Sequence, residues 1–250
     1  MKLVGRKISG RLAAVWTVSS LLSLPIQVVA DVEGPFRVLS PEGSKPHRAV
    51  LLVPGCSGFT ATNGINLYEE RAAELKAAGY VVVFVDDVGR RMQSNCAHVS
   101  WDEVSADILE AAAWTRRQSG VDSARISVIG WSYGAGGLLA LLKAMPSDSQ
   151  ITKAVMYYPV CRGAVPWSTN VTGLMLLGRI DDIAFPALCD AVIRGMQPDK
   201  LRTVTYPNAR HGFDMRGLGE RADLPSGSPG YNAEAATASW SVVTDFLKKD

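Results

Sequence analysis

The sequence predicts a single-domain α/β protein with a mostly parallel central sheet and helices on both faces. Short apolar runs rich in β-branched residues alternate along the chain with longer segments of helical periodicity, which is the pattern of parallel strands joined by crossover helices. One such run, "ARISVI", leads directly into "GWSYGAGG" (130–137), a glycine-rich turn between a strand and a helix. In sheets of this kind, ligand-binding and catalytic residues lie at the carboxyl ends of the strands.

The first predicted strand is "RAVLLV" (48–53), a continuous apolar run that ends at Pro54-Gly55. "YVVVFVDD" (80–87) is apolar and rich in valine, as expected for a strand that is covered on both faces. Further strands are predicted, in chain order, at 125–130, 152–160, 172–178 and 201–207.

Helices are predicted between these strands. "LYEERAAELKAAG" (67–79) has helical spacing, and Gly79 suits its C-cap. Other helical segments are predicted at 101–120, 135–145, 183–195 and 233–249. The chain shows no internal repeat and no linker, so residues 31–250 are predicted to form one domain.

The first thirty residues differ from the rest. They contain four basic residues and no acidic one: Lys2, Arg6, Lys7 and Arg11. An apolar stretch follows, and Val28 and Ala30 suit the −3 and −1 positions of a cleavage site. This pattern predicts a secretory signal peptide at 1–30, with an uncleaved membrane anchor as the alternative.

Removal of that segment changes the charge of the chain. Lys plus Arg falls from 26 to 22 while Asp plus Glu stays at 24, so the net charge moves from +2 to −2. The remaining cations are scattered, which does not predict a nucleic-acid partner. We therefore expect a secreted or periplasmic protein without membrane attachment after cleavage; the oligomeric state stays open.

The predicted compartment determines how the cysteines are interpreted. All four lie in the predicted exported part: Cys56, Cys96, Cys161 and Cys189. An even count in an oxidising compartment predicts two disulfides in one of three pairings, with four free thiols as the alternative. No Cys-x-x-Cys pair or Cys/His cluster suggests a metal site, and we expect neither a metal nor another cofactor.

Ser132 is the candidate nucleophile. It lies at the centre of Gly-x-Ser-x-Gly, between a predicted strand and a helix rich in glycine and alanine, which is the setting of a nucleophile elbow. A serine hydroxyl needs a general base. Of the three histidines, His47 precedes the first core strand and His98 lies in a polar loop, whereas His211 follows the last predicted strand. His211 is therefore the expected base.

The acid of such a triad should follow a strand between these two residues. "LMLLGRIDD" supplies Asp181 and Asp182, and spacing alone does not separate them, since either could instead cap the next helix. An oxyanion hole requires two backbone N–H donors. We expect them from Tyr133, which follows the nucleophile, and from Cys56 in the turn "PGCSG".

Taken together, these motifs resemble the dienelactone hydrolase family of the α/β-hydrolase superfamily. The resemblance spans about residues 48–249. It is carried by "LLVPGCSG", "GYVVVFVDDVGRR", "IGWSYGAGG", "LLGRIDDIAFPALC" and "YPNARHGFD", in that order. It implies an α/β-hydrolase fold with Ser132 as nucleophile, His211 as base and Asp181, at the end of Gly-x-x-Asp, ahead of Asp182 as the acid.

The resemblance has further implications and two departures. It implies that Arg91 steers the substrate, although a solvated or structural arginine is equally expected. The strand order of the family also implies the disulfides Cys56–Cys96 and Cys161–Cys189. Trp131, beside the nucleophile, is a candidate to line the acyl pocket. Pro54 replaces the family's usual histidine, and a serine replaces the cysteine of the best-known dienelactone-cleaving members.

The expected function is hydrolysis of a small-molecule carboxylic ester or lactone through an acyl-enzyme on Ser132. Two alternatives keep the same fold. A peptidase or amidase is disfavoured because the chain carries no added propeller or long lid domain. A non-catalytic binding module is disfavoured because the three catalytic residue types are all present in the expected order.

Overall fold

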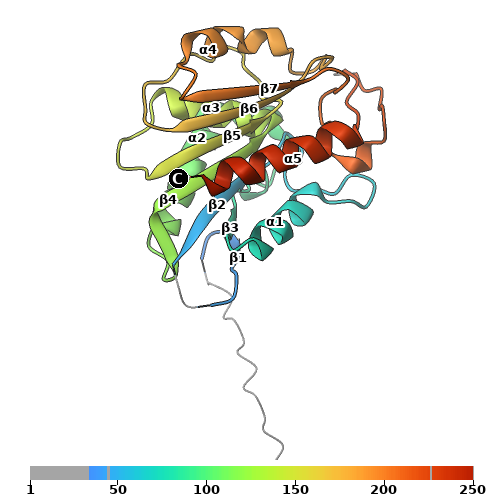
Figure 1. The fold of residues 1–250 in the computed structure, drawn as a ribbon. Helices are drawn as coiled ribbons and strands as arrows, with labels where there is room; N and C mark the ends of the chain where they lie inside the picture. Colours follow the sequence, from blue (N-terminus) through green and yellow to red (C-terminus); the bar gives the residue numbers. More distant parts are fainter. Residues whose placement is uncertain (1–33, 44–45, 226, 250) are drawn as a thin grey trace, which may run out of the picture. The chain divides into compact units, whose positions relative to one another are not determined.

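The computed structural model describes residues 34–43, 46–225 and 227–249. In these residues, seven strands form one sheet in the order β1-β3-β2-β4-β5-β6-β7 (Figure 1). The predicted signal peptide lies outside these residues. Every pairing is parallel except that of β1 with β3. The strands are β1 (Arg37–Leu39), β2 (His47–Val53), β3 (Val81–Phe84), β4 (Val121–Trp131), β5 (Ile151–Tyr157), β6 (Thr172–Gly178) and β7 (Leu201–Tyr206).

Helices cover both faces of the sheet. They are α1 (Leu67–Ala77), α2 (Trp101–Thr115), α3 (Ser132–Lys143), α4 (Asp190–Gly195) and α5 (Ala233–Lys248). Along β2, Ala49, Leu51 and Val53 pack in one core cluster with residues of α2 and α3, whereas Val50 and Leu52 pack in the other with residues of α1 and α5. Figure 1 shows α1 and α5 together on one face. Because side chains alternate along a strand, each central strand must be apolar throughout.

The α/β-hydrolase architecture predicted from the sequence is therefore confirmed, with differences at the element ends. The strand β1 was not predicted: it is three residues long and partly exposed, so it lacks a recognisable apolar run. The helix predicted at 101–120 ends at Thr115, and β4 begins at Val121, before the expected residue 125. Among the described residues, no helix has both the length and the apolar character needed to cross a membrane.

Two disulfides join loops at the carboxyl ends of neighbouring strands. Cys56–Cys96 connects the turn after β2 to the segment after β3, and Cys161–Cys189 connects the segment after β5 to the one after β6. This is the pairing that the family resemblance implied. The loops that carry Ser132, Asp181 and His211 emerge from the same edge of the sheet, since β4, β6 and β7 run parallel.

Candidate active site

The turn between β4 and α3 places Ser132 in a constrained backbone conformation. Its φ is +49°, in the left-handed region that non-glycine residues rarely occupy. The two glycines of the motif are required by close backbone approach. A Cβ on Gly130 would lie 2.9 Å from the backbone of Ala135, and one on Gly134 would lie 2.3 Å from the carbonyl oxygen of Pro54. The sequence Gly-x-Ser-x-Gly is thus a packing requirement of this turn.

The side chains of Ser132, His211 and Asp181 form a continuous hydrogen-bonded series. His211 Nε2 lies 2.8 Å from Ser132 Oγ, and His211 Nδ1 lies 2.8 Å from Asp181 Oδ2. His211 follows β7 and Asp181 follows β6. Both residues are buried, so water competes little for these hydrogen bonds. The structure therefore brings together the three residues that the sequence suggested for a triad.

The two adjacent aspartates have different surroundings. The second oxygen of Asp181, Oδ1, accepts hydrogen bonds from the N–H groups of Ile183 and Ala184 at 2.9 and 2.8 Å, which fixes the carboxylate toward His211. Asp182 instead accepts a hydrogen bond from the N–H of Ser228, and this bond lowers the pKa of its carboxyl group. Of the two, only Asp181 contacts the imidazole in the structure.

The two expected oxyanion donors, Cys56 and Tyr133, line the same cavity as Ser132. Tyr133 is in the first turn of α3, which has no side-chain cap, and the turn containing Cys56 packs against Ser132, since a Cβ on Gly55 would lie 3.5 Å from the Cβ of Ser132. Within the described residues, neither the Cys56 N–H nor the Tyr133 N–H has a hydrogen-bond acceptor. Both N–H groups are thus free to donate to a substrate oxygen.

Several contacts hold the turn that contains Cys56 in place. The N–H of Gly134 donates to the carbonyl of Pro54 at 3.1 Å, and the N–H of Cys96 donates to the carbonyl of Cys56 at 2.8 Å. The N–H of Gly55 donates to the hydroxyl of Tyr68 at 2.9 Å. Together with the disulfide, these bonds connect the turn to α1, α3 and the segment after β3.

A cavity of about 660 Å³ opens above Ser132, and both Cys56 and Tyr133 line it. Its volume lies within the usual range of small-molecule sites. Aromatic and apolar side chains cover much of its wall: Tyr68, Trp131, Tyr133, Tyr158, Val160, Ile183, Met215, Leu218, Leu224 and Pro229.

Trp131 and Arg91, the two other predicted site residues, have different positions. Trp131 lines the cavity, but it is only 1% exposed, so most of its ring is part of the core. Arg91 does not line the cavity. Its guanidinium group donates to Asp107 and Glu103 of α2, at 2.5 and 3.1 Å. The structure thus places Arg91 in the structural role that was the alternative to substrate steering.

A buried carboxylate behind the site was missed by the sequence reasoning. Asp214 accepts hydrogen bonds from Trp131 Nε1 at 2.9 Å and from the hydroxyl of Tyr158 at 2.7 Å. The ring of Tyr158 lies 4.6 Å from that of His211. Asp214 therefore links Trp131, the residue before the nucleophile, to Tyr158, whose ring packs against His211.

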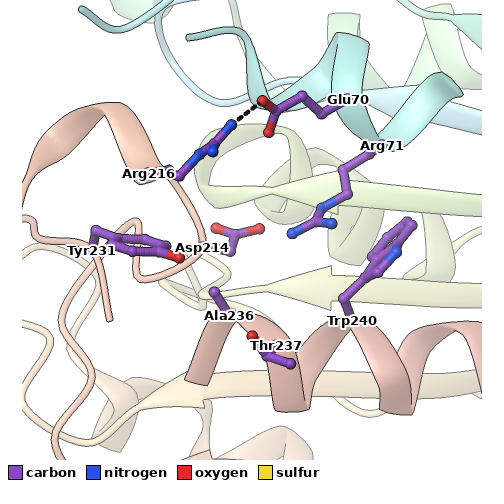
Figure 2. Close-up of a pocket in the computed structure, with 8 residues that line it drawn as sticks. All are labelled: Glu70, Arg71, Asp214, Arg216, Tyr231, Ala236, Thr237 and Trp240. Atoms are coloured by element: carbon purple, nitrogen blue, oxygen red, sulfur yellow. Dashed lines mark hydrogen bonds and ion pairs between the residues drawn. The ribbon is translucent and has the colours of Figure 1, made fainter. Parts of the chain in front are cut away.

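The other side of Asp214 faces a hollow of about 200 Å³, shown in Figure 2. The guanidinium group of Arg71 points toward Asp214 there, and Glu70 and Arg216 form an ion pair above it. Burial raises the pKa of Asp214 above its usual value, although the hydrogen bonds from Tyr158 and Trp131 and the positive charge of Arg71 oppose this. A signal for Asp214 in the sequence was its position in "HGFD", three residues after the candidate base.

Solved structures with this fold include several hydrolases. A proposed dienelactone hydrolase from Klebsiella pneumoniae shares 18% identity at a TM-score of 0.69, covering 86% of this chain and 92% of that one. The dienelactone hydrolase-like promiscuous phosphotriesterase P91, from metagenomic libraries, shares 19% identity at a TM-score of 0.66, covering 82% and 87%. Thermogutta terrifontis esterase 2, phosphoramylated by tabun, shares 14% identity at a TM-score of 0.61, covering 85% and 88%.

No curated protein sequence matches the chain significantly. The family model of the dienelactone hydrolases, in contrast, matches residues 36–250, which include β1 to α5 and all three residues of the hydrogen-bonded series. The chain therefore belongs to the dienelactone hydrolase family and is a serine hydrolase.

Proposed function

We propose that the protein is an exported enzyme that cleaves carboxylic esters or lactones through an acyl-enzyme on Ser132. The observation that carries this proposal is the pair of 2.8 Å contacts that His211 makes, one with Ser132 Oγ and one with Asp181 Oδ2. The imidazole is positioned to remove a proton from the hydroxyl, and the carboxylate is positioned to hold one tautomer and stabilise the imidazolium ion.

Acylation follows from this arrangement. As Ser132 Oγ bonds to the substrate carbonyl carbon, its proton moves to His211 Nε2, while the Nδ1–H donates to Asp181. The carbonyl oxygen becomes an oxyanion that accepts hydrogen bonds from the N–H groups of Cys56 and Tyr133. The imidazolium then gives its proton to the alcohol oxygen as the carbon–oxygen bond breaks. In a lactone, that alcohol stays attached to the acyl group.

Deacylation uses the same groups with water in place of serine. His211 Nε2 takes a proton from a water molecule whose oxygen bonds to the acyl carbon, and Ser132 Oγ recovers the proton as it leaves. The products are a carboxylic acid and free enzyme. Among the described residues, no group of three or more His, Cys, Asp or Glu side chains is arranged to hold a metal ion.

The solved structures with this fold also support the proposal. One is an esterase phosphoramylated by tabun and another is a phosphotriesterase. An organophosphorus group is therefore a suitable probe of Ser132, because it reacts with the activated serine of a hydrolase.

The test is labelling with a fluorophosphonate, together with assays on short p-nitrophenyl esters and on peptide anilides. We expect labelling of Ser132 and ester hydrolysis, both lost in Ser132→Ala. Ser123→Ala is the matched control, since Ser123 is exposed on the same strand, β4. Absence of labelling and of ester turnover would contradict the proposal, and faster cleavage of the anilides would replace it with an amidase function.

Export is the second part of the proposal. Both disulfides of the structure are typical of proteins in oxidising compartments. The basic and apolar segment at 1–30 has the composition of a secretory signal. Expression of the full chain in a bacterial host, followed by mass spectrometry of the periplasmic fraction, should find a mature protein that starts at Asp31. Retention of residues 1–30 on the purified protein would contradict cleavage.

A further inference from the structure

From the composition of the cavity above Ser132 we infer that the substrate is an uncharged ester or lactone whose alcohol part is apolar. This inference rests on the proposed function and names its substrate class. Apart from His211, each of the 22 described residues that line the cavity has an uncharged side chain. A charged substrate would lose its hydration there without gaining an ion pair.

The direction of proton transfer places the alcohol part of the substrate near one wall of the cavity. His211 Nε2 delivers a proton to the alcohol oxygen, so the alcohol part must lie on the side of His211. That side is apolar. Leu218 packs beside Gly212, where a Cβ would lie 2.6 Å from Leu218 Cδ1, and Met215 lies near the same point at 3.4 Å. Leu224 and Pro229 also line the cavity, and Pro229 precedes Gly230, whose N–H donates to the carbonyl of His211 at 2.9 Å.

The neighbouring polar wall is uncharged as well. It comes from the segment between β2 and α1, with Ser57, Thr60, Thr62 and Asn63. Asn63 Nδ2 donates to the carbonyl of Gly217 at 2.8 Å, which joins this wall to the apolar one. The two walls therefore enclose the substrate with hydroxyl, amide and hydrocarbon groups.

Three arginines of the surrounding loops are paired with carboxylates, and two others, Arg162 and Arg179, are exposed and do not line the cavity. Arg91 is bound to α2 through Asp107 and Glu103. Arg216, next to Met215, forms an ion pair with Glu70 in the separate hollow of Figure 2, which Asp214 and Tyr231 also line. Arg210, next to His211, lies 4.0 Å from Asp182. A substrate carboxylate in the cavity would have to break one of these pairs to bind Arg91, Arg210 or Arg216.

The test compares two butyrate esters whose alcohol sides differ by methylation of one carboxylate, which removes its negative charge. One is the ester of 3-hydroxybenzoate, and the other is the ester of methyl 3-hydroxybenzoate. Each rate is divided by the rate of hydroxide-catalysed hydrolysis, which removes the difference in leaving-group reactivity. We expect kcat/KM for the neutral ester to be about 100-fold higher, because the carboxylate would be desolvated without a partner.

A variant with a new cation tests directly where the alcohol part of the substrate lies. Leu218→Arg introduces a guanidinium group beside the alcohol part, and it should reduce the preference for the neutral ester about tenfold. Leu224→Arg, at a half-exposed position of the same wall, is a second variant in case the first folds poorly. Leu188→Arg is the matched control, since Leu188 is 46% exposed and lies outside the cavity wall. It should leave the preference unchanged.

The possible outcomes separate this inference from the proposed function. Equal or faster cleavage of the anionic ester by the unmodified enzyme, with Ser132 still labelled by a fluorophosphonate, would overturn the substrate class and leave the hydrolase intact. An unchanged preference in both Leu218→Arg and Leu224→Arg, when these variants are folded, would overturn the placement of the alcohol part. Failure of both esters to react, together with no labelling of Ser132, would overturn the proposed function and this inference with it.

Discussion

At the scale of single residues, Asp181 and Asp182 are adjacent carboxylates with different partners. Asp181 contacts His211, whereas Asp182 accepts a hydrogen bond from the N–H of Ser228. Asp181→Asn should lower kcat by about 10³–10⁴-fold, because the amide no longer holds the productive imidazole tautomer. Asp182→Asn should change kcat by only about twofold. Steady-state kinetics on p-nitrophenyl butyrate checks both variants, and a larger loss in Asp182→Asn would contradict this assignment.

Asp87 gives a second prediction at this scale, for stability. It is fully buried, and neither carboxylate oxygen has a hydrogen-bond partner in the described part of the chain. The pKa of Asp87 is raised from 3.8 to about 7, chiefly because burial disfavours the charged carboxylate and also because of the negative charge of Asp107. Between pH 3.8 and about pH 7, the folded protein binds a proton on Asp87 that the unfolded chain does not bind. The free energy of unfolding therefore falls as the pH rises through this range.

Asp87→Asn removes this titration. We expect the variant to be more stable than the unmodified protein by about 2–4 kcal/mol near pH 8, and by much less near pH 5. Urea unfolding at both pH values measures the difference. Asp245→Asn is the control, because Asp245 is exposed on α5. An effect of equal size at both pH values would show that Asp87 does not titrate in this range.

At the scale of elements, Asp214 connects the ends of two strands to the loop that carries the base. Trp131 ends β4 and Tyr158 directly follows β5, and both donate hydrogen bonds to Asp214. Asp214→Ala leaves two buried donors without an acceptor. It should lower kcat about 100-fold with little change in KM, and destabilise the fold by about 2–5 kcal/mol. Asp214→Asn keeps an acceptor and should recover most of the kcat.

The rate of fluorophosphonate labelling separates positioning from stability. It is measured well below the melting temperature of each variant, so that only folded protein reacts. If Asp214 positions the elbow and the base, Asp214→Ala should label slowly even when it is fully folded, and Asp214→Asn should label nearly as fast as the unmodified enzyme. An unchanged labelling rate in folded Asp214→Ala would show that the network serves stability alone.

At the scale of the whole molecule, the sequence predicted what depends on chain order and strand ends. Ser132, Asp181 and His211 each follow a predicted strand, and parallel strands bring such positions to one edge of the sheet. The sequence did not predict Asp214, because its partners lie 83 and 56 residues away and its place three residues after His211 does not show which side chains it contacts. The role of Arg91 likewise depends on which face of α2 presents Asp107, and only tertiary packing determines that.

The two disulfides provide the last prediction, because they are similar in span and differ in position. Their sequence separations are 40 and 28, so each should stabilise the fold by about 4 kcal/mol through the entropy of the unfolded chain. Cys56 and Cys96 line the cavity, and Cys56 also supplies a candidate oxyanion N–H. Cys161 and Cys189 are buried in the core, outside the cavity wall.

Paired Cys→Ser variants therefore separate stability from catalysis. Replacing Cys56 and Cys96 should lower both the melting temperature and kcat, the latter about tenfold or more, because the turn after β2 is no longer braced against the segment after β3. Replacing Cys161 and Cys189 should lower the melting temperature by a similar amount while kcat, measured on folded protein, stays within about twofold. Thermal unfolding and ester kinetics on both variants make the comparison. Equal kcat values in the two would show that the first bridge has no part in holding the oxyanion turn.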